Sequence, residues 1–174
     1  MSKKEIILLK ALELFASKGY DATSTRQIAT EAQVSEGLIF RHFNNKEGLL
    51  EAVLQQGINR ATQYITPILE MTDPRQIIES SICLPIHVPV EEHEFWKLLY
   101  NLKWQRANYP QEAFALLQQK LTSAFESLGF EYPELEARLI EIYIDGLATE
   151  ILLRGGEPTA LTQKILTKYF KNEH

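Results

Sequence analysis

This chain of 174 residues has little cysteine, no long apolar run and a minority of basic residues. The opposite features mark secreted, membrane-spanning and nucleic-acid-coating proteins. Cys83 is its single cysteine, so no disulfide forms within the chain and a reducing compartment is expected. Its apolar runs stay short of the roughly 18 residues that a membrane-spanning helix needs. Near the N-terminus, Lys10 and Glu13 interrupt the stretch that would be continuously apolar in a signal peptide. The sequence therefore predicts a cytoplasmic protein that does not associate with membranes.

Basic residues are also in a minority. The chain has 18 Lys and Arg against 23 Asp and Glu, a net charge of −5, which excludes a protein that coats nucleic acid with its whole surface. The charge is unevenly distributed. Residues 1–50 carry seven basic and six acidic residues, a net charge of +1, and residues 51–174 carry eleven and seventeen, a net charge of −6. A local site for nucleic acid is compatible with the first segment only.

Motifs for catalysis are missing. The sequence has no G-x-x-x-x-G-K, no G-x-G-x-x-G and no G-x-S-x-G. Residue types that ligate metals come close together once, at Cys83, His87, Glu92 and His93. Pro85 and Pro89 interrupt the helix that would align the first two, and the spacing is not that of a zinc site. We predict neither a catalytic nor a metal site, and no cofactor.

The chain does contain a regular series of helix-start and helix-stop signals. Ser2 and Ser24 each begin a capping box, glycines stand at helix ends, and prolines stand at the first positions of later helices. These signals predict an all-α protein of about nine helices, in a domain over residues 1–50 and a second over 51–174. The expected helices cover residues 2–18, 24–32, 35–43, 46–69, 74–84, 91–108, 110–128, 133–154 and 158–170, with a loop at 85–89.

Residues 24–43 read as two short helices joined by a tight turn, the helix-turn-helix arrangement. Ile28, Ala29, Val34, Ile39 and Phe43 are spaced to pack the two helices together. The other side chains of the second helix are then left at its outer face and N-terminal end, where a helix can enter the major groove of DNA.

This segment resembles the TetR family of bacterial transcriptional regulators. The pattern is T-R-x-I-A-x-x-A-x-V-S-x-G-x-x-x-x-H-F followed by N-K-E-x-L-L. The matching residues are Thr25, Arg26, Ile28, Ala29, Ala32, Val34, Ser35, Gly37, His42, Phe43, Lys46, Glu47 and Leu49. The resemblance covers residues 5–60, and the remainder shows only the family's helical layout.

The resemblance implies a DNA-binding surface. Hydroxyl and backbone N–H groups at the start of the first motif helix, together with Lys46, would hold phosphates. Gly37 would let the DNA backbone approach, and exposed Leu38 and Phe40 would contact thymine methyl groups. The full set of expected DNA contacts is Ser24, Thr25, Arg26, Ser35, Glu36, Gly37, Leu38, Phe40, Arg41, His42 and Lys46. Gln33 departs from the glycine frequent in the family's turn; a positive φ there costs roughly 1–2 kcal/mol.

The last two helices predict a dimer. Apolar residues in 133–154 cover more than one helical stripe, so that helix is expected to be buried on two sides, and the last helix adds a second apolar face. We expect the interface at Tyr143, Leu147, Ile151, Ile165 and Tyr169. The alternative is a helix buried entirely within its own chain.

Aromatic residues cluster in the middle of the chain and suggest a site for a small apolar or aromatic ligand. We expect this site at Phe95, Trp96, Tyr100 and Trp104, with polar contacts from His87, Arg106 and Asp145. The same aromatic residues are equally compatible with ordinary core packing.

The leading hypothesis is therefore a one-component transcriptional regulator and not an enzyme. A homodimer would bind a near-palindromic double-stranded DNA operator, as a repressor that a small ligand releases or modulates. The alternative is a helical ligand-binding or protein-interaction module that does not read DNA. Glu36, Phe40 and the weak local charge favour that alternative.

Overall fold

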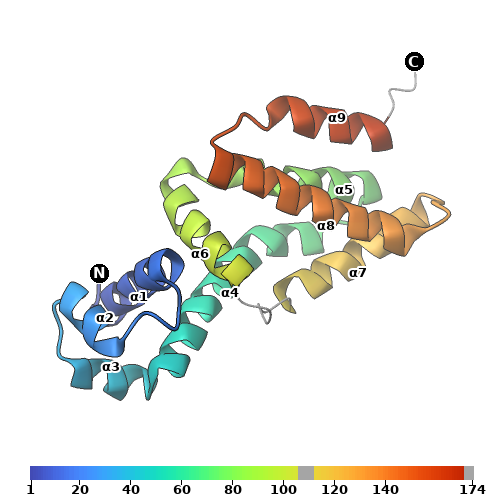
Figure 1. Ribbon diagram of the computed structural model, residues 1–174. Coiled ribbons are helices and arrows are strands. Elements are labelled where there is room, and N and C mark those ends of the chain that lie inside the picture. Colours follow the sequence, from blue (N-terminus) through green and yellow to red (C-terminus); the bar gives the residue numbers. More distant parts are fainter. Residues whose placement is uncertain (106–111, 171–174) are drawn as a thin grey trace. The chain divides into compact units, whose positions relative to one another are not determined.

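Helices account for nearly all the regular structure of the computed structural model, which describes residues 1–105 and 112–170 (Figure 1). Within these residues there are nine α-helices and no strand, which confirms the all-α prediction. The helices are α1 Lys3–Lys18, α2 Thr25–Glu31, α3 Glu36–Phe43, α4 Lys46–Glu70, α5 Pro74–Cys83, α6 His93–Gln105, α7 Glu112–Ser127, α8 Pro133–Thr149 and α9 Thr159–Tyr169.

The first helices begin where their side chains satisfy free backbone N–H groups. The Ser2 hydroxyl accepts a hydrogen bond from the Glu5 N–H, and the Glu5 carboxylate accepts one from the Ser2 N–H at 2.6 Å. These hydrogen bonds lower the pKa of Glu5. Ser24 and Gln27 form the same reciprocal pair at α2. Each capping box supplies partners that the first turn of a helix otherwise lacks.

Two segments differ from their predicted conformation. The loop prediction at residues 85–89 is wrong in part, because 3₁₀ turns form at Leu84–His87 (η1) and Val90–Glu92 (η2), and α6 begins only at His93. Proline holds φ near −65°, a value that a 3₁₀ turn also requires. The other difference follows α8, where Glu150–Arg154 form a π turn (η3) that ends at Gly155, with φ 66°. The predicted helix over 133–154 is thus α-helical only to Thr149.

The chain divides into two compact units, and the first contains the helix-turn-helix segment. It takes Met1–Arg60 and the described part of Glu94–Pro110. Its core is built mainly by α1, by the first half of α4 and by α6, whose Leu99 and Leu102 are fully buried. Gly57 on α4 leaves the space that the Leu99 side chain fills. The helices that carry the predicted DNA contacts therefore rest on a core that α6 completes.

The second unit takes Ala61–His93 and the described part of Gln111–His174. In this unit α8 packs against α5, α7 and α9, and α7 and α8 run beside each other in Figure 1. Phe125 is fully buried and contacts the rings of Phe130 and Tyr169. The predicted domain boundary at residue 50 lies inside α4, which contributes residues to both units.

The turn between α2 and α3 contains a backbone conformation that a side chain rarely adopts. Gln33 has φ 53°, and among the described non-glycine residues only Asn44 shares a positive φ. A side chain in this region costs about 1–2 kcal/mol, whereas glycine avoids that cost but has a more flexible unfolded chain. The turn is therefore held by its surroundings against the preference of Gln33.

We predict that Gln33→Gly raises the free energy of unfolding by about 0.5 kcal/mol, since relief of strain exceeds the added unfolded-state entropy. Gln33→Val should lower it by about 1–2 kcal/mol, because a β-branched residue tolerates positive φ poorly. Urea denaturation of the full chain measures both changes. Equal stabilities for the two variants would show that the turn is not strained.

Candidate nucleic-acid interface and ligand pocket

The α2–turn–α3 segment presents one face to the core and the other to solvent. Ile28 and Ile39 are fully buried, and Ala29 and Phe43 nearly so. The Val34 N–H donates to the Ala29 carbonyl at 2.9 Å and closes the turn. The side chains whose spacing predicted the packing of α2 against α3 are thus the ones that are buried in the core or packed against it.

On the solvent side of α3, Gly37, Phe40 and Arg41 lie together at helical spacing and are exposed. Phe40 keeps 44% of its surface exposed, and no heavy atom lies within 4 Å of the position that a Cβ at Gly37 would take. His42 is exposed too. Leu38 differs from the expectation, because it is half-buried and packs against the core of the first unit. Fewer residues of α3 are therefore exposed than were predicted to contact DNA.

A hydrogen bond joins the start of α2 to the start of α3. The Thr25 hydroxyl donates to the Glu36 carboxylate at 2.6 Å. The Ser24 hydroxyl is occupied by the capping box of α2, while Arg26 and Ser35 are exposed. Two residues predicted to contact DNA thus hold each other in place across the turn.

Sequence reasoning missed the role of Tyr20, which precedes α2. Its hydroxyl donates to the Glu47 carboxylate at 2.6 Å, and the Lys46 ammonium lies 4.2 Å from the centre of its ring. Phe15 supports the ring from the core, with centroids 5.3 Å apart. A cation over an aromatic face is held electrostatically. Tyr20 therefore restrains the start of α4 and the ammonium that was predicted to bind phosphate.

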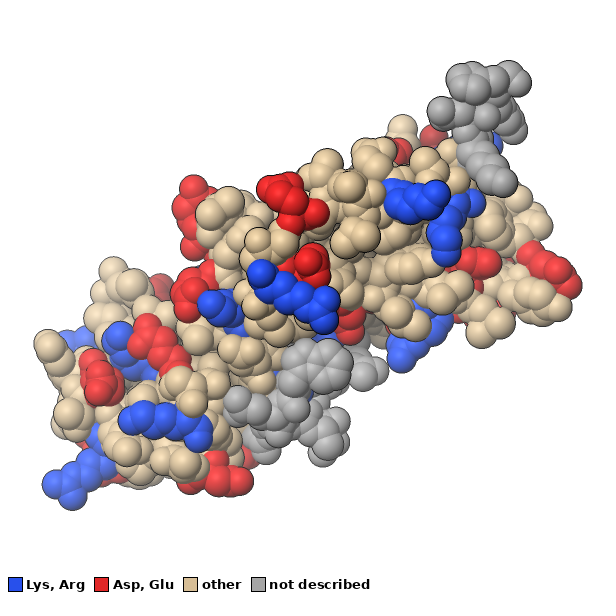
Figure 2. Space-filling model, turned by 45° about the horizontal axis from the view of Figure 1, so that its top comes forward, with Lys and Arg blue, Asp and Glu red and all other residues tan. Residues whose placement is uncertain are grey.

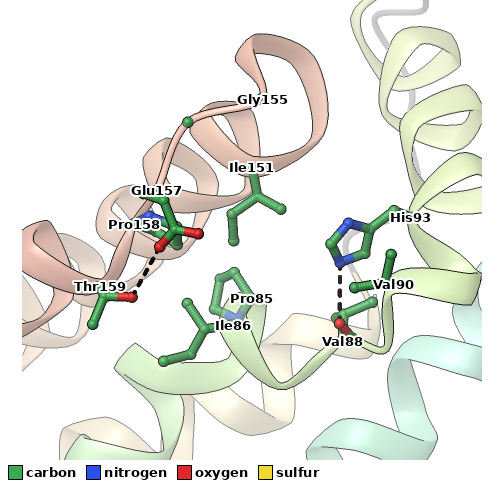
Figure 3. Close-up of a pocket in the computed structure, with 11 residues that line it drawn as sticks. Pro85, Ile86, Val88, Val90, His93, Ile151, Gly155, Glu157, Pro158 and Thr159 are labelled. Atoms are coloured by element: carbon green, nitrogen blue, oxygen red, sulfur yellow. Dashed lines mark hydrogen bonds between the residues drawn. The ribbon is translucent and has the colours of Figure 1, made fainter.

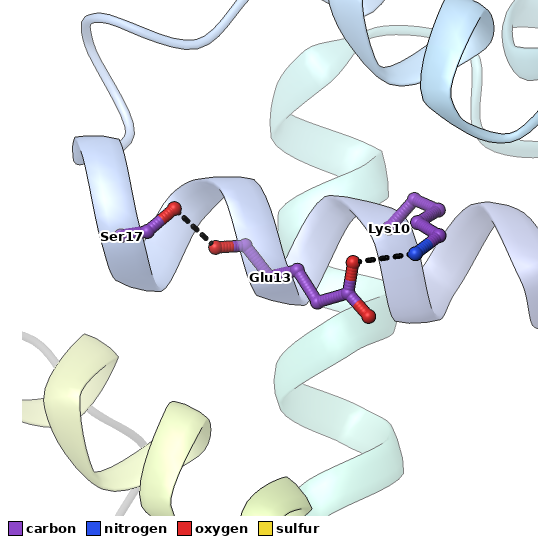
Figure 4. Close-up of polar contacts among 3 residues, drawn as sticks. All are labelled: Lys10, Glu13 and Ser17. Atoms are coloured by element: carbon purple, nitrogen blue, oxygen red, sulfur yellow. Dashed lines mark hydrogen bonds and ion pairs between the residues drawn. The ribbon is translucent and has the colours of Figure 1, made fainter.

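Charges elsewhere on the first unit partly cancel within helices. On α1, the Lys10 ammonium lies 2.7 Å from the Glu13 carboxylate, which raises the pKa of Lys10, and the Ser17 hydroxyl donates to the Glu13 carbonyl (Figure 4). Figure 2 shows basic and acidic side chains interspersed over the face in view. Binding of DNA cannot rest on a broad positive field there and requires a small number of placed groups.

The described aromatic residues that were predicted to bind a ligand lie in the first unit. Phe95 and Trp96 are partly buried against its core, and the Arg60 guanidinium lies 3.9 Å from the centre of the Phe95 ring. Tyr100 is half-buried. The Trp104 side chain and Arg106 lie outside the described residues. Phe95 and Trp96 thus contribute to core packing, and a ligand site at the predicted residues stays a prediction.

A pocket of about 370 Å³ lies in the second unit (Figure 3). Its walls come from the connection between α5 and α6 and from the corner between α8 and α9. The lining residues are Pro85, Ile86, Val88, Val90, His93, Ile151, Gly155, Gly156, Glu157, Pro158 and Thr159. None of the seven predicted ligand residues belongs to this set. His87 is exposed between two lining residues, and Asp145 is half-buried elsewhere on α8.

The residues predicted for the dimer interface mostly have partners within their own chain. Leu147 is only 3% exposed and belongs to the core of the second unit, against which Ile165 also packs, and Ile151 lines the pocket. The Lys168 ammonium donates to the Tyr143 hydroxyl at 2.9 Å. Tyr169 donates to the Glu136 carboxylate at 3.0 Å, and burial raises the pKa of Tyr169.

The exposed apolar residues of α8 and α9 form a different set. They are Leu135, Leu139, Ile142 and, on α9, Leu161. On α8 these positions follow the i, i+4, i+7 spacing of one helical stripe, which Gly146 continues without any described atom within 4 Å of its Cβ position. An apolar stripe therefore faces away from the protomer.

The described ranges also bear on two other classes of site. No helix there is long and apolar enough to cross a bilayer. No three His, Cys, Asp or Glu residues in residues 1–105 and 112–170 are grouped so that they could hold a metal ion.

Comparisons with known proteins agree with the geometry of the first unit. The family model described as bacterial regulatory proteins, tetR family, matches residues 7–53. YvkB of Bacillus subtilis, named as an uncharacterized HTH-type transcriptional regulator, is 30% identical over 171 residues. That alignment covers 94% of this chain and 79% of YvkB.

Solved structures extend the likeness to both units. The transcriptional regulator FadR from Bacillus subtilis, in complex with stearoyl-CoA, has a TM-score of 0.72 at 19% identity and covers 98% of this chain and 99% of its own. A protein from Saccharomonospora viridis in complex with choline has a TM-score of 0.71 at 20% identity and covers 98% and 96%. At such low identity these likenesses establish the fold alone. The family match and the relative of nearly full length establish more: this chain belongs to the TetR family of bacterial transcriptional regulators and is not an enzyme.

Proposed function

We propose that this regulator binds a near-palindromic DNA operator as a homodimer and represses transcription until a small ligand lowers its affinity for the operator. The observation that carries the proposal is the exposed face of α3, where Gly37, Phe40 and Arg41 are presented beside a restrained Lys46. It would act in the cytoplasm, where the DNA is.

Each group on this face has chemistry suited to DNA. Gly37 leaves room for the close approach of the phosphate backbone, and Phe40 offers an apolar surface to a thymine methyl group. Arg41 can donate two hydrogen bonds to the edge of a guanine. Lys46 supplies a point charge for a phosphate, and the exposed Arg26 and Ser35 are placed at helix starts for further phosphate contacts.

The Thr25–Glu36 hydrogen bond supports a defined docking geometry. A carboxylate near phosphates is unfavourable unless it has a donor of its own. Here the Thr25 hydroxyl provides one donor at 2.6 Å, which leaves the second carboxylate oxygen for the exocyclic amine of a cytosine. The acidic residue that counted against DNA binding thus acquires a role in reading sequence.

We predict that Arg41→Ala and Lys46→Ala weaken DNA binding in different ways. Loss of Arg41 should cost about 1–3 kcal/mol on the operator and relax preference at one base pair. Loss of Lys46 should weaken all sequences alike and reduce the slope of log K against log salt by about 1. Fluorescence anisotropy over a salt series, with operator and scrambled duplexes, measures both.

Lys18→Ala is the matched control, since Lys18 is exposed at the end of α1 outside the helix-turn-helix. This variant should leave the preference for operator over scrambled duplexes unchanged. If Arg41→Ala and Lys46→Ala both bind like the wild type, the proposed interface is wrong. If the wild-type chain selects no sequence from random DNA, the proposal gives way to a helical module that does not read DNA.

The exposed stripe on α8 and α9 supports the homodimer. Leu135, Leu139 and Ile142 leave apolar surface in water that a second copy would cover. Gly146 lies on the same stripe with no contact in its own chain that requires a glycine, so it would permit close approach of the partner helix. A two-fold dimer would also supply the two α3 helices that two half-sites about 34 Å apart require.

We predict that Ile142→Glu converts the dimer to a monomer, because it places a charge where apolar side chains meet. Leu116→Glu is the matched control, since Leu116 is 57% exposed on α7, a helix that does not carry the stripe. Sedimentation velocity at micromolar concentration should show a monomer for the first and a dimer for the second. A wild-type chain that sediments only as a monomer would remove the dimer from the proposal.

The connection between α5 and α6 supports coupling between ligand and DNA. It lines the pocket in the second unit and continues directly into α6, whose Leu99 and Leu102 are buried in the core of the first unit. A ligand that changes the path of Val88–His93 therefore acts on a helix that the DNA-binding unit needs. Coupling of about 1–3 kcal/mol would suffice for regulation. The same fold holds stearoyl-CoA in one neighbour and choline in another, which supports a ligand-responsive role.

A further inference from the structure

The pocket in the second unit is built from irregular backbone on both sides. One wall comes from the π turn Glu150–Arg154 and from Gly155, whose φ is 66°. The other wall comes from the 3₁₀ turns on either side of Val88. Single π turns in helices are uncommon and frequently mark functional sites. Figure 3 shows the Ile151 side chain of the π turn directed toward Pro85 and Ile86, which form an apolar floor.

The polar groups of the lining side chains are mainly acceptors. The His93 Nε2 lies 3.1 Å from the Val88 carbonyl, and because a carbonyl only accepts, this nitrogen carries a proton and donates. In the neutral ring Nδ1 is then an acceptor. Glu157 stands across the pocket from His93 in Figure 3, and its carboxylate accepts a hydrogen bond from the Thr159 hydroxyl at 3.3 Å. A ligand that complements these side chains therefore carries hydrogen-bond donors.

The charges of the lining side chains favour the same kind of ligand. Among the lining residues Glu157 is the one carboxylate, and none is Lys or Arg. The start of α9 favours a negative charge at Glu157 and reduces its attraction for a cation, but no basic side chain of the lining opposes a positive ligand. The pocket as a whole favours a positive ligand.

We propose that this pocket binds a small organic cation, a protonated amine with a short apolar body. The apolar body lies on Pro85, Ile86 and Ile151, and the ammonium donates to the Glu157 carboxylate, with the His93 ring on the opposite wall. A volume of about 370 Å³ is near the lower end of the roughly 300–1,000 Å³ of small-molecule sites, so the ligand is short. The assignment rests on the proposed ligand-responsive function and specifies its ligand.

The test compares n-hexylammonium with 1-hexanol, which has the same chain and no charge, by titration calorimetry on the full chain. The amine should bind at least severalfold more tightly than the alcohol. Glu157→Gln should remove this preference and weaken amine binding on the order of fivefold, the upper range for an exposed ion pair. Glu126→Gln, which removes a carboxylate on α7 outside the pocket, should leave the preference unchanged.

Equal binding of amine and alcohol to the wild type, or an amine preference that survives Glu157→Gln, would overturn the assignment. If Glu157 served only the start of α9, Glu157→Gln would lower stability and leave the amine preference unchanged. Operator binding measured in the absence of amine tests the proposed function separately from the amine site. A chain that selects no operator but still prefers the amine would retain the cation site and lose the regulator.

Discussion

The structure depends on the burial of α6 in the core of the DNA-binding unit. A three-helix segment of about 60 residues buries little of its own apolar surface and is marginally stable by itself. Here Leu99 and Leu102 are inserted among residues of α1 and α4, Gly57 leaves space for Leu99, and the Arg60 guanidinium covers Phe95. The helix-turn-helix therefore obtains part of its core from α6, which follows residues 61–93 of the second unit in the sequence. In the proposed function, this helix would be the physical route by which a ligand in the second unit affects DNA binding.

The proposed DNA-binding face carries few charges, so the affinity proposed for it depends on their placement. The net charge of residues 1–50 is only +1, and Lys10 is paired with Glu13. Two of the charged groups are held by contacts: Tyr20 restrains Lys46 while bonded to Glu47, and Thr25 holds Glu36. Restrained side chains lose less entropy when they bind. A protein with this charge distribution gains more from two such faces held in register than from nonspecific attraction to phosphate.

Apolar residues outside the core cluster of the second unit have two separate proposed uses. The stripe on α8 and α9 faces outward, whereas Ile151 and Pro85 face a pocket within the unit. On α8 the π turn separates the two, because it changes the helical register between Thr149 and Gly155. Leu135, Leu139 and Ile142 lie before it, whereas Ile151 lies within it.

The amino-acid sequence by itself determined the helices, because their signals are local. Ser2, Ser24 and Pro133 act on backbone groups within a turn of themselves, and the i, i+4 spacing of Ile39 and Phe43 identified the buried face of α3. Only the tertiary structure decided what each apolar face contacts. A period shows that Leu147 and Ile142 lie on stripes of α8, but not that one stripe meets the chain's own core and the other meets solvent. The aromatic residues Phe95 and Trp96 carry no signal that distinguishes a core from a pocket. His93 and Glu157 are far apart in the sequence, and the folding of two irregular connections against each other brings them to one pocket.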